Sequence, residues 1–157
     1  MYSPTWLYLA PGLLFVCAGL LISALALPGA TVFGATLGGH SLLFASLFLM
    51  IGWQCIQFGV FAKTFAITER LIPESPRMRW VSRIVTLERC LLLGIGGMAI
   101  GGALLVSAIS QWAGTGFGEL DYSVTMRWVI PGVTMFALGC QTTLSGFFLS
   151  ILKMARR

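Results

Sequence analysis

The stretch LLFASLFLMIGWQCIQFGVFA, residues 42–62, decides the fold class of this chain. It contains no Lys, Arg, Asp or Glu, and its length matches the roughly 20 helical residues that cross ~30 Å of hydrocarbon. A helix is expected because in lipid the backbone must satisfy its own hydrogen bonds, and the alternating pattern of barrel strands is absent. We therefore predict a transmembrane helix here.

Similar stretches flank this one, so we predict an all-α membrane protein with four transmembrane helices in a single domain, residues 1–157. The expected spans are residues 6–27, 42–62, 90–112 and 128–152. Composition agrees, because only 10% of the residues are charged, whereas soluble domains carry about 25%. The first span is expected to be retained rather than cleaved as a signal peptide, because no basic residue precedes it and it is too long for a typical signal.

The basic residues predict the orientation. Six of the ten lie between Lys63 and Arg89, and three more, Lys153, Arg156 and Arg157, follow the last span. The positive-inside rule places the central loop, residues 63–89, and the C-terminus in the cytoplasm, and four spans then place the N-terminus there too. The net charge of +5 is explained by this orientation, so no nucleic-acid partner is expected.

The central loop carries two local signals. Pro73 is expected to end the second helix, because proline clashes with the preceding helical turn. Residues 78–85 place apolar and basic side chains on opposite helical faces, which predicts a short amphipathic helix at the membrane interface, with Trp80 at headgroup level. A solvated linker is the alternative.

Polar and small residues inside the spans predict helix packing. Gln54, Gln57 and Gln141 are the most polar groups at depth, and buried amides of this kind join helices by hydrogen bonds. A polar lining for a lipid-borne substrate is the alternative. Gly97 and Gly101 form a GxxxG pair, which allows close backbone approach within the chain or between protomers.

A short internal repeat relates the second and fourth spans. Gly52, Gln54, Gly59 and Phe61 recur at the same offsets as Gly139, Gln141, Gly146 and Phe148. Both copies fall on spans expected to run inward, which is consistent with a duplicated helical hairpin. A chance match over so few positions is the alternative.

Charged residues gather where the second and third spans meet the cytoplasm. If these spans form a hairpin, Lys63, Arg70, Glu88 and Arg89 lie near one headgroup plane, together with Glu69. Basic groups there suit a lipid phosphate, through charge-assisted hydrogen bonds. Topology signals combined with Glu–Arg pairing are the alternative explanation.

No metal or catalytic motif is recognisable. The four cysteines form no CxxC pair, and His40 has no second ligand nearby. There is no phosphate-binding glycine loop and no nucleophile elbow. Glu119 and Asp121 are interpreted as part of a solvated outer loop. On its own residues, the chain is a poor enzyme candidate.

The order of several short motifs resembles the C-terminal membrane region of bacterial family-2 glycosyltransferases, of the polyprenyl-phosphate (dolichol-phosphate) sugar synthase type. The motifs cover nearly the whole chain: Ser3-Pro4-Thr5-Trp6-Leu7, Ala10-Pro11-Gly12, Phe58-Gly59-Val60-Phe61-Ala62-Lys63, Pro73-Glu74, Thr86-Leu87-Glu88-Arg89, Gly116-Phe117-Gly118 and Val129-Ile130-Pro131-Gly132. In that family a cytoplasmic domain transfers a sugar from a nucleotide donor to a polyprenyl phosphate, and the membrane region anchors it and helps to present the lipid.

The resemblance implies a membrane module in the bacterial inner membrane, with polyprenyl phosphate and a cytoplasmic glycosyltransferase domain as partners. Lipid proximity carries over to Lys63, Glu88 and Arg89. Only Met1 and Tyr2 precede the first motif, so the catalytic domain is expected to lie elsewhere, and a divalent metal would belong to that domain. The competing hypotheses are a small oligomeric transporter or flippase for lipid-linked sugars and a purely structural anchor.

Overall fold

The computed structural model describes residues 4–32, 35–71, 73, 85–116 and 122–154. In this part of the chain the elements are α1 (Pro4–Ala26), β1 (Thr31–Val32), β2 (Ala35–Thr36), α2 (Gly39–Thr68), α4 (Leu87–Gly114) and α5 (Tyr122–Met154). All four helices are long and apolar enough to cross a membrane. The predicted all-α membrane fold is confirmed. The one addition is a ladder in which Thr31 pairs with Thr36 and Val32 with Ala35.

Three of the helices extend beyond the predicted spans at both ends, most clearly around the central loop. α2 continues to Thr68 and α4 begins at Leu87, so Lys63 and Arg89 belong to helices and not to a loop over residues 63–89. The 30 residues of α2 extend about 45 Å, well beyond ~30 Å of hydrocarbon. A helix continues past the hydrocarbon because its backbone hydrogen bonds remain satisfied in the headgroup region.

Pro73 does not end α2, contrary to expectation. The amide of Arg70 donates to the Ile67 carbonyl at 3.0 Å, and the amide of Leu71 donates to the Ala66 carbonyl at 2.9 Å. These two bonds form a Schellman motif, with Arg70 in the left-handed region at φ 55°. The helix is therefore closed by its own terminal carbonyls before the proline is reached.

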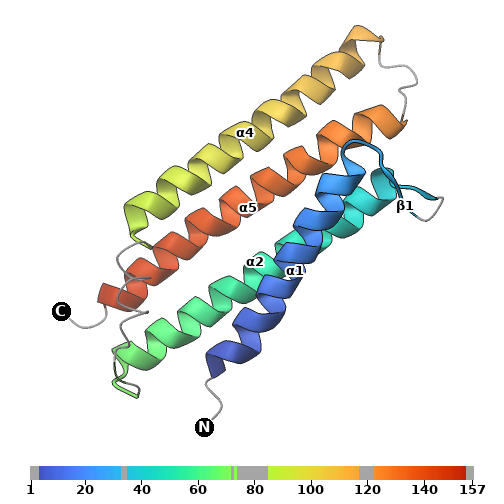
Figure 1. Ribbon diagram of the computed structural model, residues 1–157. Coiled ribbons are helices and arrows are strands. Elements are labelled where there is room, and N and C mark those ends of the chain that lie inside the picture. Colours follow the sequence, from blue (N-terminus) through green and yellow to red (C-terminus); the bar gives the residue numbers. More distant parts are fainter. Residues whose placement is uncertain (1–3, 33–34, 72, 74–84, 117–121, 155–157) are drawn as a thin grey trace.

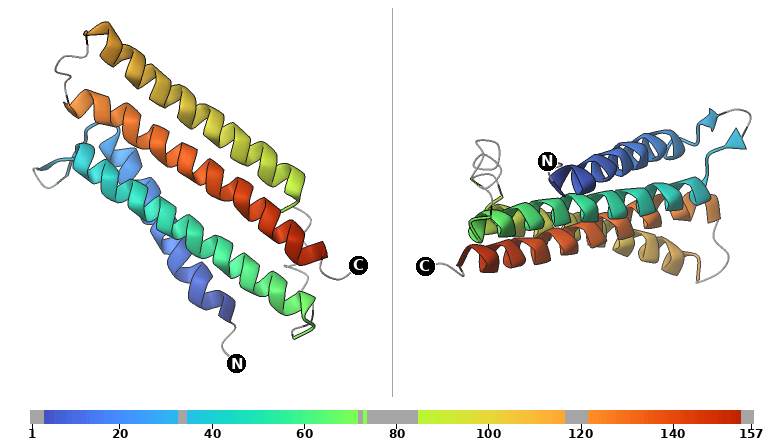
Figure 2. Two further views of the ribbon diagram at one scale, coloured as in Figure 1. Left: turned by 180° about the vertical axis from the view of Figure 1, so that it is seen from behind. Right: turned by 90° about the horizontal axis from the view of Figure 1, so that it is seen from below.

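The helices form two hairpins joined through α2 and α5. α1 packs on α2, α4 packs on α5, and α5 also packs on α2, so the order across the bundle is α4, α5, α2, α1 (Figure 1). Figure 2 shows α1 on the side of α2 away from α5. The end of α2, the start of α4 and the end of α5 lie at one end of the bundle, opposite the β ladder (Figure 1). α5 thus separates α2 from α4. The expected hairpin of the second and third spans required these two helices to pair, and they do not.

The contacts inside the two hairpins match residue for residue. A Cβ placed on Gly52 would lie 2.7 Å from the Gly12 oxygen and from the Val16 nitrogen. A Cβ on Gly139 would lie 2.5 Å from the Gly94 oxygen and 2.7 Å from the Met98 nitrogen. The equivalence extends one step further along each hairpin, from Gly19 against Ala45 and Leu49 to Gly101 against Gly132 and Phe136. These recurring contacts support a duplicated hairpin.

Few side chains are fully enclosed by the bundle itself. One small cluster at the β-ladder end joins Ala26, Leu42 and Ile130, with Leu37 and Met126 packed against it. Large apolar residues such as Leu93 (72% exposed) face outward. Such surfaces are unfavourable in water and are solvated by lipid tails in a bilayer.

Hydroxyl groups within the helices bond to their own backbone. Thr64, Thr134 and Thr142 each donate to the carbonyl four residues earlier, at 2.7–2.8 Å. This satisfies a polar group without a partner helix.

The predicted amphipathic helix over residues 78–85 lies outside the described residues except for Val85. The cytoplasmic orientation of the termini stays a prediction.

Candidate functional site

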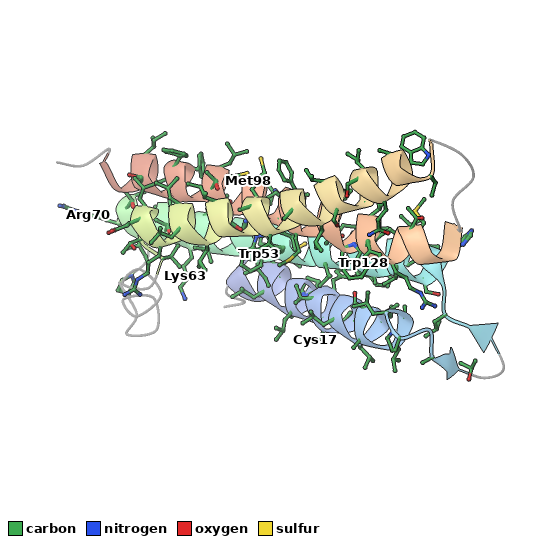
Figure 3. All side chains as sticks on the ribbon, turned by 90° about the horizontal axis from the view of Figure 1, so that it is seen from above. Cys17, Trp53, Lys63, Arg70, Met98 and Trp128 are labelled. Atoms are coloured by element: carbon green, nitrogen blue, oxygen red, sulfur yellow. The ribbon has the colours of Figure 1, made fainter. Side chains whose placement is uncertain are left out.

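Lys63 lies at the place where α1 begins and α2 nears its end. One turn before it, Gly59 faces α1, because a Cβ there would lie 3.3 Å from Tyr8 Cβ and 3.4 Å from Leu9 Cγ. Residues one turn apart share a helix face, so Lys63 continues the α1-facing stripe. Its side chain is half-buried, and Figure 3 shows it extending from α2 on the side where α1 lies.

An apolar groove of about 270 Å³ lies at the same end of α2 as Lys63. We call it the aromatic groove, and it is lined by Tyr8, Phe58, Phe61, Ala62, Phe65, Phe148 and Leu152. The ring centroids of Phe61 and Phe148 lie 4.8 Å apart at 62°, an edge-to-face contact of the favourable kind. Lys63 is not one of the lining residues, although Ala62, the residue before it, is.

The other predicted charged residues lie at the same end of the bundle but are not gathered around Lys63. Arg70 is exposed and points outward beyond the end of α2 (Figure 3). Glu88 and Arg89 are exposed in the first turn of α4, which α5 separates from α2. The four residues therefore share one end of the bundle without forming one cluster around Lys63.

The Thr86–Arg89 motif also has a structural role. The Thr86 side chain accepts a hydrogen bond of 3.4 Å from the Arg89 amide, which is the helix N-cap arrangement. Glu88 is the acidic residue of this first turn, where a carboxylate complements the helix dipole. The residue types at positions 86 and 88 are thus accounted for by helix initiation alone.

The three glutamines line a second groove of about 340 Å³ between α2 and α5. We call it the amide groove, and its lining is Gln54, Gln57, Phe61, Gln141, Leu144, Ser145 and Phe148. Buried Gln57 Nε2 and Gln141 Oε1 have no hydrogen-bond partner. The inter-helix bond at this level instead runs from Trp53 Nε1 to Thr142 Oγ1, at 3.2 Å.

The sequence analysis predicted neither the hydrogen bond between Trp53 and Thr142 nor the ring contact between Phe61 and Phe148. The internal repeat was the signal that could have found the phenylalanines. They are equivalent positions of the two hairpins, and in a structure with two parallel copies equivalent residues lie at the same depth.

The two predicted packing glycines face α5. A Cβ on Gly97 would lie 3.3 Å from the Gly139 Cα, and one on Gly101 would lie 2.5 Å from the Phe136 nitrogen. Neighbouring Gly96 and Gly102 have nothing within 4 Å. The GxxxG pair therefore supports the α4–α5 contact within the chain.

The described residues contain no group of three or more His, Cys, Asp or Glu that could hold a metal ion. The chemistry available at this end of the bundle is binding, by a half-buried ammonium group and a separate apolar groove. The sequence matches a family described as the glycosyltransferase family 2 C-terminal transmembrane region over residues 60–153, more than half of the chain. No curated protein and no solved structure shows significant similarity to it.

Proposed function

Because this chain belongs to the family of glycosyltransferase family 2 C-terminal transmembrane regions, we propose that it anchors a glycosyltransferase and presents its lipid acceptor. The acceptor is a polyprenyl phosphate in the bacterial cytoplasmic membrane, and a cytoplasmic catalytic domain performs the sugar transfer. This chain contributes binding and position. No residue of it is assigned a catalytic role.

The observation that carries this proposal is the position of Lys63. A lipid phosphate needs a cation at the headgroup level and an apolar surface at the same end of the bundle for its hydrocarbon chain. Lys63 is half-buried, follows the lining residue Ala62, and lies at the end of α2 that carries the aromatic groove. An ammonium group donates charge-assisted hydrogen bonds to phosphate, and these are stronger when water is partly excluded.

Arg89 is the second candidate for phosphate binding, and it lies across α5 from Lys63. The attraction between Arg89 and a phosphate held at Lys63 is weak if the two are more than about 8 Å apart, because exposed charges are screened beyond that distance at physiological ionic strength. We therefore assign the larger share of binding to Lys63 and a smaller, salt-sensitive share to Arg89.

The test is binding of polyprenyl phosphate to the chain in nanodiscs, with Lys63→Gln, Arg89→Gln and the double variant. Arg70→Gln is the matched control, because it removes the same charge at the same end from a side chain that points away from the groove. We expect the double variant to bind most weakly, followed by Lys63→Gln and then Arg89→Gln. Arg70→Gln should bind nearly as well as the wild type. Equal losses in Lys63→Gln and Arg70→Gln would show unspecific attraction and refute the proposed site.

A further inference from the structure

Arg127 is a cation that neither the expected membrane orientation nor the phosphate site proposed at Lys63 accounts for. The other nine basic residues lie between Lys63 and Arg89 or follow the last span. Arg127 lies near the start of α5, at the β-ladder end of the bundle and opposite the end that carries Lys63 (Figure 1). The positive-inside rule therefore gives no reason for a cation at this position.

The Arg127 guanidinium lies against the turn that follows α1. A Cβ on Gly29 would lie 2.5 Å from Arg127 Nη2, 3.4 Å from Cζ and 3.6 Å from Nη1. The Gly29 amide donates to the Ala26 carbonyl at 3.1 Å, and Gly29 has φ 75°. The Ala30 amide donates to the Leu25 carbonyl at 3.1 Å. Gly29 is thus the left-handed residue of a Schellman end, and its missing side chain leaves room for the guanidinium.

The chain offers this guanidinium little compensation for its lost water. The C-terminal end of the α1 dipole attracts a cation, but only as a partial charge. Arg127 is half-buried, and its Nε is enclosed without a hydrogen-bond partner. The carboxylates that the structure describes, Glu69 and Glu88, lie at the other end of the bundle. A half-buried ion without a counter-ion is costly, so an anion from outside the described residues is expected here.

The level of Arg127 along α5 indicates which anion is available. The midpoint of α5, Tyr122–Met154, is residue 138, so Arg127 lies 11 residues from it, or about 16 Å. If α5 is centred in the bilayer, this is the edge of the hydrocarbon, which extends about 15 Å to each side. Two tryptophans at this end of the bundle, Trp112 and Trp128, are 43% and 49% exposed, as is typical of side chains at the membrane–water interface. The anion that a bilayer supplies at this level is the phosphate of its lipids.

We propose that Arg127 binds the phosphate group of a membrane lipid at the β-ladder end of the bundle. Nε is enclosed and out of reach of a ligand, so the bonds come from Nη1 and Nη2. A guanidinium can donate two parallel hydrogen bonds to the oxygens of one phosphate. The contact with Gly29 holds the guanidinium in place before the lipid binds. This site is independent of the one proposed at Lys63, which lies at the opposite end.

The test is photocrosslinking of the full chain in liposomes, using phosphatidylglycerol with a reactive group near its headgroup and mapping the labelled peptides. A diacylglycerol probe with the same chains but no phosphate measures contact with lipid in general. We expect the phosphate probe to label the turn at Gly29 and the start of α5 more strongly. Arg127→Gln should lower this labelling about tenfold, because charge-assisted hydrogen bonds are lost. Labelling near Lys63 should stay unchanged, which separates the two sites.

Arg70→Gln is the matched control, because it removes the same charge from the opposite end and should leave labelling at Gly29 unchanged. Equal labelling by both probes, or equal losses in Arg127→Gln and Arg70→Gln, would overturn the proposal. So would displacement of the probe by excess inorganic phosphate, which would assign the site to free phosphate. Labelling that appears only after Glu119→Gln together with Asp121→Asn would assign Arg127 to carboxylates of the chain and would also overturn it.

A second variant keeps the proposal testable if Arg127→Gln folds poorly. Arg127→Lys keeps the charge and an apolar stem but loses the planar pair of donors. Its labelling at Gly29 should fall between those of the wild type and Arg127→Gln. Labelling equal to that of the wild type would refute a guanidinium site.

Discussion

Replacement of Gly101 by alanine tests whether close backbone approach holds α4 on α5. A Cβ on Gly101 would lie 2.5 Å from the Phe136 nitrogen and 2.6 Å from the Gly132 oxygen, whereas ordinary contact begins at 3.4 Å. Both obstacles are backbone atoms, so no side-chain rotation relieves them and the helices must separate. Gly102 is the matched control, because a Cβ there meets nothing within 4 Å.

The magnitude follows from two opposing effects. Replacement of glycine by alanine inside a helix stabilises the folded state by roughly 0.5–1 kcal/mol, because alanine loses less backbone conformational freedom on folding. Overpacking at a close contact costs about 1–3 kcal/mol. Gly102→Ala is therefore expected to be neutral or stabilising. Gly101→Ala should be less stable than Gly102→Ala by about 2 kcal/mol, which is more than a tenfold change in the folded-to-unfolded ratio.

The assay is reversible unfolding in mixed micelles by titration with dodecyl sulfate, followed by helical circular dichroism. Gly97→Ala adds an intermediate point, because its Cβ would lie 3.3 Å from the nearest atom. We therefore expect Gly102→Ala to be the most stable of the three variants, Gly97→Ala to be intermediate and Gly101→Ala to be the least stable. Equal unfolding midpoints for Gly101→Ala and Gly102→Ala would refute the reasoning, because the two changes differ only in what the new methyl group meets.

Three further predictions use the same unfolding measurement. Trp53→Phe and Thr142→Val should show a coupling energy of about 0.6 kcal/mol in a double-mutant cycle, because each removes the one bond that joins them; zero coupling would mean that the bond contributes nothing. Arg70→Gly should stabilise by about 1 kcal/mol, because a left-handed residue at φ 55° is strained unless it is glycine; lower stability would contradict the assigned Schellman end. Gly29→Ala should destabilise the folded state by about 1–2 kcal/mol, since Gly29 has φ 75° and a Cβ there would meet the Arg127 guanidinium at 2.5 Å. This loss of stability should be smaller in an Arg127→Ala background. An unchanged loss would mean that the backbone conformation alone causes it.

Much of the fold was predictable from local sequence. The four spans were identified by apolar length alone. The ends of the helices that contain them were not predicted, because capping bonds, not hydropathy, terminate α2 and initiate α4. Pro73 was a misleading signal, since the Arg70 and Leu71 amides had already closed the helix. The family resemblance was correct at the level of the transmembrane region.

The candidate site was predictable only in part. Charge pattern selected Lys63, and polarity selected Gln57 and Gln141. The neighbours of these residues could not be predicted, because the expected pairing of the second and third spans is interrupted by α5. Tyr8 shows the difficulty most directly: nothing in its own surroundings along the chain indicates that it lines a groove with Phe148.

Hydropathy along the chain is enough to specify four membrane helices, because each helix satisfies its own backbone hydrogen bonds and needs no neighbour to be stable in lipid. The choice of which helices touch is visible only in the folded chain. Lipid tails are as apolar as the side chains, so hydrophobicity does not select partners within the bilayer, and packing must do so. The selection is made where glycines such as Gly52 and Gly139 let one backbone approach another, and only the folded chain shows which backbone that is.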